Sequence, residues 1–496
     1  MTDASGNTSY TYDNRDRLKT KATPEGTLNY TFDAHSNLLT ILSSNANGAS
    51  VTYTPDQLNR IGTVTDNRLV AQGVSSAVTT YHYYPVGTIQ NYTYSTNSVQ
   101  TAYTYDKLNR LLSVGSTMGN NALSSFTYSP FPALTQTVSE LNGRTVAYGY
   151  DNDYHLQSET ITADPAGNNG VANYTYDFVG NRKTLTSTIP SVSNMSYTYD
   201  ANDRLNSDTY DNDGNTIVSG IVTNTYDFEN RMLTSGAVSM VYDGDGNRVG
   251  ETAGGVTTQY LVDTLNPTGY SQVLDDLVNG SVTKTYTYGL QRISENQLVG
   301  STWTPTFYGY DGHGNVRFLG NTAGTVTDTY QFDAFGNPIT RTGSTANSYL
   351  YSGERWDSNL GLYHLRARYY NQATGRFETM DPGKETCCAL RPPQVGNIFD
   401  PGTLHKYVYT QNNPVNRVDP SGNDDILEYV DVLLDIKDVR ENTKFASEIA
   451  YCDSIALTSV AATLAGLPGS GQSVAEEFAQ CLADSEKGLL PYSFIF

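Results

Sequence analysis

The sequence predicts a mostly β protein built from antiparallel hairpins, followed by a small helical unit. The chain holds 39 Tyr and 43 Gly in 496 residues, only 16% of its residues are charged, and a Tyr-Asp pattern recurs along its first 350 residues. Tyr and Thr favour pleated, half-buried strands, while Gly, Asn and Asp favour the tight turns between them. A hydrophobic content of 38% suits many strands that each bury one face.

The repeat unit reads Tyr-x-Tyr-Asp-x-x-x-Arg-Leu. Alternation along a strand places both rings on one face, Asp, Asn and Gly make the turn, and Arg-Leu begins the return strand. Each unit therefore predicts a β-hairpin, and stacked hairpins are expected to bury a continuous aromatic ladder that one hairpin cannot hide alone. Copies begin at Tyr10, Tyr30, Tyr103, Tyr148, Tyr174, Tyr197, Tyr226, Tyr242, Tyr308 and Tyr330.

A distinctive segment, residues 361–382, closes the repeat array. Its motif residues are Arg368, Tyr369, Tyr370, Gly375, Arg376, Phe377, Asp381 and Pro382. A second stretch downstream contributes Asn412, Asn413, Pro414, Asp419, Pro420 and Gly422. A repeat array, a closing segment and a short unrelated tail together indicate a scaffold that carries something at its C-terminus.

These patterns resemble the YD repeats of the RHS and teneurin-like proteins, and residues 361–382 resemble the RHS-associated core. The resemblance covers about residues 8–422. It implies an antiparallel β-sheet that spirals into a shell, with the core segment plugging one end. Known shells of this kind have longer repeat arrays, so we expect a small, open or incomplete shell. The predicted divisions are a repeat shell over 1–350, the core or plug over 351–422, and a variable helical region over 423–496.

The resemblance also implies a pair of catalytic acids. RHS-type shells that cut themselves carry two aspartates that act like an aspartyl-protease pair, which requires carboxyls close enough to share a proton. The matching positions are Asp381 and Asp419, with Asp400 as a competing partner, and cleavage is expected shortly after Gly422. Asn423 departs from the family, which commonly has an apolar residue there. The alternative is that these aspartates only make turns through Asx bonds.

Other polar groups are expected to be structural. The Asp-rich segments 211–215 and 243–247 resemble the first half of a calcium loop, but Val222 and Gly254 stand where the bidentate Glu is needed. Neither the four cysteines nor the six dispersed histidines have a metal-ligand spacing, so we predict no metal and no cofactor. Arg366, Arg368 and Arg376 are expected to bond carboxylates within the plug rather than phosphate.

The tail differs in character from the repeats. Apolar residues at helical spacing predict helices over about 424–439, 445–465 and 473–486. Thirteen acidic residues and four basic ones follow residue 422, with no His, which argues against a nuclease. The sequence contains no run of 18 or more apolar residues, so we predict no transmembrane helix. No signal peptide is visible, and a start almost inside a repeat suggests a fragment or a shortened member.

Three functions remain open. The leading hypothesis is a shell scaffold, not itself an enzyme beyond self-cleavage, that encapsulates or presents its C-terminal segment as a toxin-like cargo. It would serve contact-dependent antagonism between bacteria or envelope delivery, outside the cell or on its surface, with immunity or secretion-system proteins as partners. The second is a cell-surface module that recognises carbohydrates or cells and has an inert tail. The third is a decayed member with neither activity. With a net charge of −21, the shell is not expected to bind nucleic acid.

Overall fold

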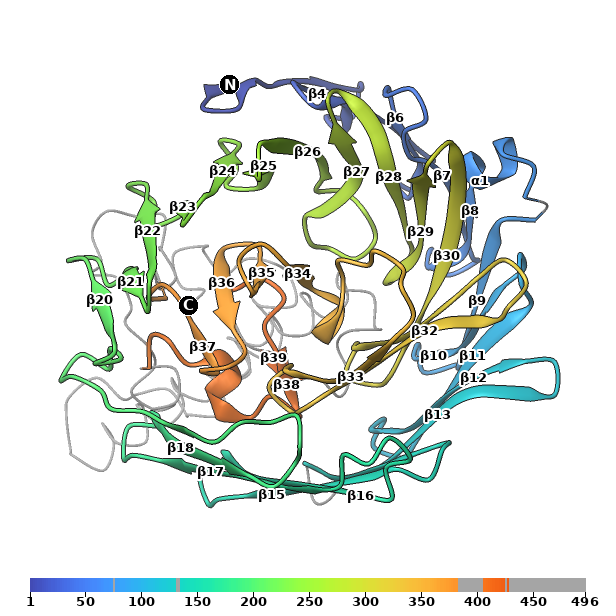
Figure 1. Ribbon diagram of the computed structural model, residues 1–496. Coiled ribbons are helices and arrows are strands. Elements are labelled where there is room, and N and C mark those ends of the chain that lie inside the picture. The colour runs from blue at the N-terminus through green and yellow to red at the C-terminus, as the bar shows by residue number, and fades with distance from the viewer. Residues whose placement is uncertain (75, 131–133, 382–404, 424–425, 428–496) are drawn as a thin grey trace, which may run out of the picture. The chain divides into compact units, whose positions relative to one another are not determined.

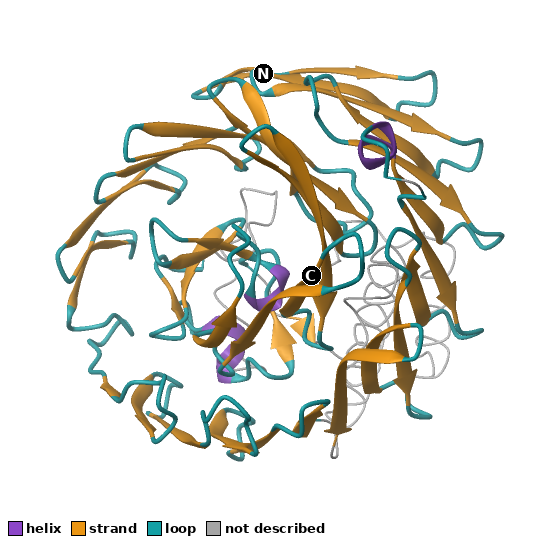
Figure 2. Cartoon of the chain, turned by 45° about the vertical axis from the view of Figure 1, so that its right-hand side comes forward, coloured by secondary structure: helices purple, strands orange, loops and turns teal. Residues whose placement is uncertain are grey.

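The computed structural model describes residues 1–74, 76–130, 134–381, 405–423 and 426–427, and this part is almost entirely antiparallel β-sheet (Figures 1 and 2). Chain contacts divide the protein into two compact units, Met1–Leu433 and Leu434–Phe496. The prediction of a mostly β hairpin fold is confirmed. The helix predicted over about 424–439 is wrong at residues 426–427, which form the strand β39 (Ile426–Leu427), paired with the strand at Arg417–Val418. The rest of the predicted tail helices lies outside the described residues. Within the described residues, no helix is both long and apolar enough to cross a membrane.

The first large sheet contains seventeen strands that pair antiparallel in sequence order. No ladder of the described residues joins β19 back to β3, so the sheet is an open ribbon. The strands are β3 (Ser9–Tyr12), β4 (Leu18–Thr23), β5 (Gly26–Phe32), β6 (Leu38–Ser43), β7 (Ser50–Pro55), β8 (Ile61–Asp66), β9 (Val78–Tyr83), β10 (Ile89–Tyr94), β11 (Val99–Tyr105), β12 (Leu111–Met118), β13 (Asn121–Pro130), β14 (Thr135–Glu140), β15 (Thr145–Tyr150), β16 (Leu156–Thr162), β17 (Gly170–Tyr176), β18 (Arg182–Ser187) and β19 (Met195–Ser196).

The second large sheet contains fourteen strands, again in sequence order. They are β20 (Asp208–Tyr210), β21 (Thr216–Ser219), β22 (Val222–Tyr226), β23 (Met232–Ser235), β24 (Val238–Tyr242), β25 (Arg248–Ala253), β26 (Val256–Asp263), β27 (Gln272–Val278), β28 (Ser281–Tyr288), β29 (Arg292–Val299), β30 (Thr302–Tyr310), β31 (Val316–Gly320), β32 (Val326–Phe332) and β33 (Pro338–Thr342).

Short elements complete the unit Met1–Leu433. A four-stranded sheet of β34 (Arg355–Asp357), β35 (Leu362–Leu365), β36 (Arg368–Asn371) and β37 (Arg376–Phe377) lies inside the curve of the second sheet (Figure 1). The others are β1 (Thr2–Asp3), β2 (Gly6–Asn7), α1 (Asn67–Ala71), β38 (Arg417–Val418), β39 (Ile426–Leu427) and 3-10 turns at Tyr351–Gly353 and Tyr409–Asn412.

The two large sheets are successive turns of an inward spiral (Figure 2). Tyr10 donates to Asp245, 235 residues later, and the Tyr94 hydroxyl donates to the carbonyl 214 residues later. Near the end of the first turn, Asn168 donates to Thr340, only 172 residues later. The separation falls because an inner turn has a shorter path than the outer turn that surrounds it.

The predicted hairpin turns form as the repeat requires. Asp106 Oδ1 accepts the N–H groups of Leu108 and Arg110 at 2.8 and 2.9 Å, and its Oδ2 accepts Arg110 Nε at 2.6 Å. Asn109 takes a left-handed conformation with φ of 58°. The ladder then shifts by one residue at Tyr105. Because one carboxylate satisfies two amides and a guanidinium, Asp closes the turn without a partner from elsewhere.

The two tyrosines of a unit have different tasks. The first tyrosine is buried among the stacked aromatic rings, as at Tyr103 and Tyr174, which are 2% and 1% exposed. The second lies nearer the rim, and its hydroxyl donates to a carbonyl at the start of the previous return strand, as from Tyr176 to Leu156 at 2.6 Å. The same kind of bond is made by Tyr83, Tyr150, Tyr199, Tyr226, Tyr242, Tyr288 and Tyr310.

Candidate functional site

Arg368, on β36, lies at the centre of the candidate site. Its Nη2 is 3.1 Å from Asp381 Oδ2 and 3.5 Å from Asp419 Oδ2. The side chains of Arg368 and Asp419 are 5% and 3% exposed, whereas that of Asp381 is 30% exposed. The structure therefore brings the two predicted acids together on one guanidinium nitrogen.

Asp419 also makes the turn that the alternative interpretation requires. Its Oδ1 accepts the N–H of Gly422 at 2.8 Å and that of Asn423 at 3.1 Å, together with the Ser421 hydroxyl at 3.1 Å. The ion pair with Arg368 uses the other carboxylate oxygen. The Asx turn and the acid pair are thus compatible, because each employs a different oxygen.

The carbonyl oxygen of Gly422 belongs to the same cluster. It accepts a hydrogen bond from Arg368 Nε, so one guanidinium contacts both acids and this carbonyl. Gly422 has φ of 76°, and any Cβ there would overlap the carbonyl oxygen of Leu365. Glycine is required for this close approach. A cation on a carbonyl oxygen makes the carbonyl carbon more electrophilic and stabilises an oxyanion.

Arg366 holds the loop that carries Asp419. Its Nη1 donates to Glu354 Oε1 at 2.9 Å and to the carbonyl oxygen of Pro420, and its Nε donates to the carbonyl of Ser271 at 3.0 Å. Arg366 and Arg368 thus bond carboxylates within the plug, as expected. The partner Glu354 was not evident from the sequence, because no local spacing relates it to Arg366.

Aromatic residues of the core motif pack the small inner sheet. Tyr370 stacks on Tyr409 at 4.2 Å between ring centroids and donates its hydroxyl to the carbonyl of Phe335 at 2.8 Å. The Arg368 guanidinium lies 3.7 Å from the centroid of the Phe377 ring. These contacts fix the arginine that binds the acids.

Other motif residues attach the plug to the surrounding turns. Arg376 Nη1 donates to Asn181 Oδ1 at 2.8 Å, so its partner is an amide oxygen instead of the expected carboxylate. Asn412 Nδ2 donates to the carbonyl of Gly180 at 2.6 Å. The remaining contacts are Tyr369 with the Tyr242 hydroxyl, Asn413 Oδ1 with Asn416, the Pro414 carbonyl with Tyr351, and Gly375 at φ of 71° beside Phe335. Pro382 and the competing acid Asp400 lie outside the described residues.

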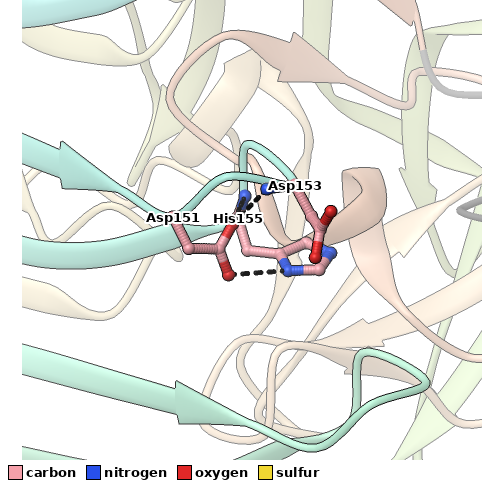
Figure 3. A group of neighbouring side chains, drawn as sticks. All are labelled: Asp151, Asp153 and His155. Carbon is pink, nitrogen blue, oxygen red and sulfur yellow. Dashed lines mark hydrogen bonds and ion pairs between the residues drawn. The ribbon is translucent and has the colours of Figure 1, made fainter.

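A second cluster, which sequence reasoning passed over, contains Asp151, Asp153 and His155 (Figure 3). Their potential ligand atoms lie within 4.8 Å of one another. Asp151 Oδ2 bonds His155 Nδ1 at 3.0 Å, and its Oδ1 accepts the N–H groups of Asp153 and His155. His155 therefore replaces the repeat arginine in an ordinary turn, and this chemistry accounts for the cluster without a metal. The carboxylates of Asp211 and Asp243 are used in their turns in the same way.

Comparison with known proteins gives partial matches. No protein-family model matches the chain. It is 32% identical over 274 residues to the tRNA3(Ser)-specific nuclease WapA of Bacillus spizizenii and 31% identical over 271 residues to the tRNA nuclease WapA of Bacillus subtilis. Each match covers 51% of this chain and 11% of the relative. The chain thus spans about a tenth of the length of these curated relatives.

The fold has clear counterparts among solved structures. The crystal structure of TcdB2-TccC3 matches with a TM-score of 0.66 and 17% identity, over 85% of this chain and 24% of that one. At this identity the likeness concerns the fold alone. The wound, open β-sheets of Met1–Leu433 therefore share the fold of that structure.

Proposed function

We propose that this chain is a toxin-related RHS scaffold that carries its own C-terminal segment, residues 423–496, as cargo. The observation that supports this most strongly is the junction before that segment. The loop Asp419–Asn423 is held by Arg366 and Arg368. Arg368 brings Asp381 and the Asp419 of this loop together beside the Gly422 carbonyl.

The matched relatives support a role in toxin delivery. The proteins named WapA are tRNA nucleases, and TcdB2-TccC3 has the same fold as this chain. Nuclease activity does not transfer to this tail, because its thirteen acids and four bases would repel a polyanion. The tail acts on another kind of target, and the protein works outside the producing cell or at its surface.

The proposed chemistry is hydrolysis of the peptide bond between Gly422 and Asn423. Asp381, the more exposed acid, removes a proton from water as the water oxygen attacks the carbonyl carbon of Gly422. Arg368 stabilises the resulting oxyanion. Asp381 then gives this proton to the nitrogen of Asn423 as the C–N bond breaks, while Asp419, whose Oδ1 accepts the Asn423 N–H at 3.1 Å, orients that nitrogen. The products are a C-terminal carboxylate on Gly422 and a free amine on Asn423.

Mass spectrometry of the purified chain tests this mechanism. Wild type should yield a fragment ending at Gly422, whereas Asp381→Asn, Asp419→Asn and Arg368→Gln should each remain near 54.2 kDa. Asp213→Asn, in an exposed turn, is the control and should cleave normally. If the wild-type chain stays intact after long incubation, the two acids do not cleave the chain and have only a structural role.

Expression of residues 423–496 alone in bacteria tests the cargo. Growth arrest is expected, with rescue by a small neighbouring gene if that gene encodes an immunity protein. Full viability at a verified expression level would remove the toxin hypothesis and leave the scaffold without a harmful cargo. Detection of the chain in culture medium or on intact cells tests its proposed location and its dependence on secretion-system proteins.

A surface recognition function is the second candidate. Exposed rings on turns favour it, since Phe178, Phe228 and Tyr154 are 111%, 89% and 63% exposed, and aromatic rings can stack on sugars. A glycan array with the full chain should then show signals that Phe178→Ser and Phe228→Ser remove. A blank array would exclude this function.

A further inference from the structure

A small cavity lies between the second turn and the four-stranded sheet β34–β37. It has a volume of about 50 Å³ and is lined by residues of β25, β26, β27, β34 and β35, together with Glu354 and Arg366. A single water needs roughly 10–15 Å³ measured in this way, so the cavity has room for a ligand of several heavy atoms. It adjoins the cluster around Arg368 through Arg366, which lines the cavity and also bonds the Pro420 carbonyl.

Three arginines and one histidine dominate its walls. Arg248 on β25, Arg355 on β34, His364 on β35 and Arg366 all line the cavity. Arg248 is only 3% exposed, yet its Nη2 has no hydrogen-bond partner, and the same is true of Arg355 Nη1 and His364 Nε2. Buried polar nitrogens are rarely left without an acceptor, so three around one cavity call for an explanation.

The neighbouring carboxylates do not accept hydrogen bonds from these three nitrogens. Asp357 and Glu251 lie 2.6 and 3.5 Å from the other terminal nitrogen of Arg248. Asp276 lies 3.6 Å from Arg355 Nη1, beyond hydrogen-bond distance. Glu354, the acid in the cavity wall, directs both carboxylate oxygens to Arg366. None of these ion pairs supplies an acceptor to Arg248 Nη2 or His364 Nε2.

The electrostatic environment of the imidazole is positive. Burial, followed by the charges of Arg248, Arg355 and Arg366, holds the pKa of His364 well below its usual value. The imidazole is therefore neutral and can donate through one nitrogen. The same positive charges that disfavour protonation of His364 would stabilise an anion in the cavity.

We propose that this cavity binds a small carboxylate anion, of the size of formate or acetate. The geometry favours this class because a planar group with two oxygens matches guanidinium donors and the volume excludes larger ligands. The ligand would lie between the side chains of Arg248, Arg355 and His364. The proposal is independent of self-cleavage and of the identity of the tail.

Thermal unfolding of the full chain in graded sodium formate, acetate, benzoate and chloride at constant ionic strength tests this site. Formate and acetate should raise Tm saturably, since a ligand that binds only the folded state stabilises it. Half-saturation by formate should fall at about 0.5 mM or above, because a ligand of three heavy atoms cannot bind more tightly. Benzoate and chloride should lack the saturable increment.

Two variants locate the effect. Val273→Phe fills the cavity while leaving its charged residues unsubstituted, and it should abolish the response to formate. Val256→Phe, at a 52% exposed position on neighbouring β26, should retain it. If Val273→Phe fails to fold, saturation-transfer NMR of acetate with wild type, competed by formate, decides. Equal effects of all four anions, or no competition in the NMR measurement, would overturn the proposal and leave a water-filled cavity.

Discussion

At the scale of single residues, the repeat depends on one left-handed position, three residues after the turn aspartate. Asn, Asp or Ser stands there in many copies, and glycine stands there at Gly180, Gly214, Gly246, Gly314 and Gly336. Tyr154 is the exception, with φ of 66° and 63% exposure. A bulky residue in this conformation is strained, and the exposed ring gains little packing in return.

Tyr154→Gly should therefore stabilise the protein by about 1 kcal/mol, because glycine adopts this conformation without the Cβ clash. Chemical denaturation at neutral pH measures the change. Tyr154→Ala is the matched control, since it removes the ring but keeps the Cβ, and it should give little stabilisation. Equal stabilisation by both variants would assign the effect to the ring and not to the backbone.

A buried acid pair connects the two turns at Glu159 and Asp333. Burial, followed by the Asp333 carboxylate, raises the pKa of Glu159 to about 8, and burial raises that of Asp333. Glu159 Oε2 accepts the N–H of Ala334 at 2.9 Å. Between its unfolded value near 4.5 and its folded value, Glu159 holds a proton only in the folded state.

The free energy of unfolding should consequently fall as pH rises from about 4.5 to 8, by on the order of 1 kcal/mol per pH unit. Glu159→Gln keeps an acceptor for Ala334 but cannot titrate, so its slope over this window should be much smaller. Urea denaturation at several pH values measures both. Glu229→Gln, with a side chain that is 50% exposed, should keep the wild-type slope. A steep slope in Glu159→Gln would show that another group causes the dependence.

At the scale of the element, neighbouring hairpins are joined by more than their ladders. The hydroxyl of the second tyrosine in a unit bonds the backbone of the preceding hairpin, as Tyr176 does with Leu156. The bond lies next to the register shift at the end of the strand, where the ladder has stopped pairing in order. It adds a bond between β17 and β16 beyond their last backbone pair on that side, Ser158 with Asn173.

Tyr176→Phe should destabilise the protein by about 1 kcal/mol, because the carbonyl of Leu156 loses its donor while the ring packing stays. Tyr12→Phe offers a matched control, since Tyr12 occupies the same position in the first repeat copy but is 58% exposed. Thermal melts of the two variants give the comparison. Equal losses would mean that this hydroxyl contributes nothing specific.

At the scale of the whole unit Met1–Leu433, the turns of the spiral are joined by buried polar bonds as well as apolar contact. Tyr30 donates to Asp263 at 2.7 Å, and Ser43 donates to Asp275 at 2.6 Å. Burial raises the pKa of both aspartates. A polar bond that must find its partner more than two hundred residues away defines one relative position of the turns, which apolar packing alone specifies less strictly.

Gly312 tests how closely the turns approach. A Cβ there would collide with the Leu111 side chain of the first turn and lie 2.8 Å from Cζ of Tyr128, whose hydroxyl accepts the Gly312 N–H at 2.5 Å. Gly312→Ala should destabilise the protein by roughly 1–3 kcal/mol through overpacking. Gly115→Ala, whose Cβ would be 3.7 Å from the nearest atom, should not. Equal stability of the two variants would indicate that the turns can separate without cost.

Much of the fold and part of the site were predictable from the sequence. Alternating Tyr-Thr-Tyr, the turn aspartate and the arginine four residues later all interact within about ten residues, so local chemistry determines each hairpin. The family resemblance named Asp381 and Asp419 as a pair, and the sequence predicted only that Arg368 bonds carboxylates in the plug; that it joins these two acids came from the structure. The division at residues 350 and 422, and the roles of Pro382 and Asp400, stay predictions, because the structure does not test them.

The sequence by itself determined the hairpins, their turns and the aromatic face that they must hide, because residues within one unit set those features. Only the tertiary structure decided that Arg368 joins two acids to the Gly422 carbonyl, that Arg376 takes an amide partner, and that three arginines surround His364. The radius and register of the spiral bring these groups together, and both arise from the packing of one complete turn against another. No local pattern of residues encodes a separation that changes from 235 to 172 along the chain.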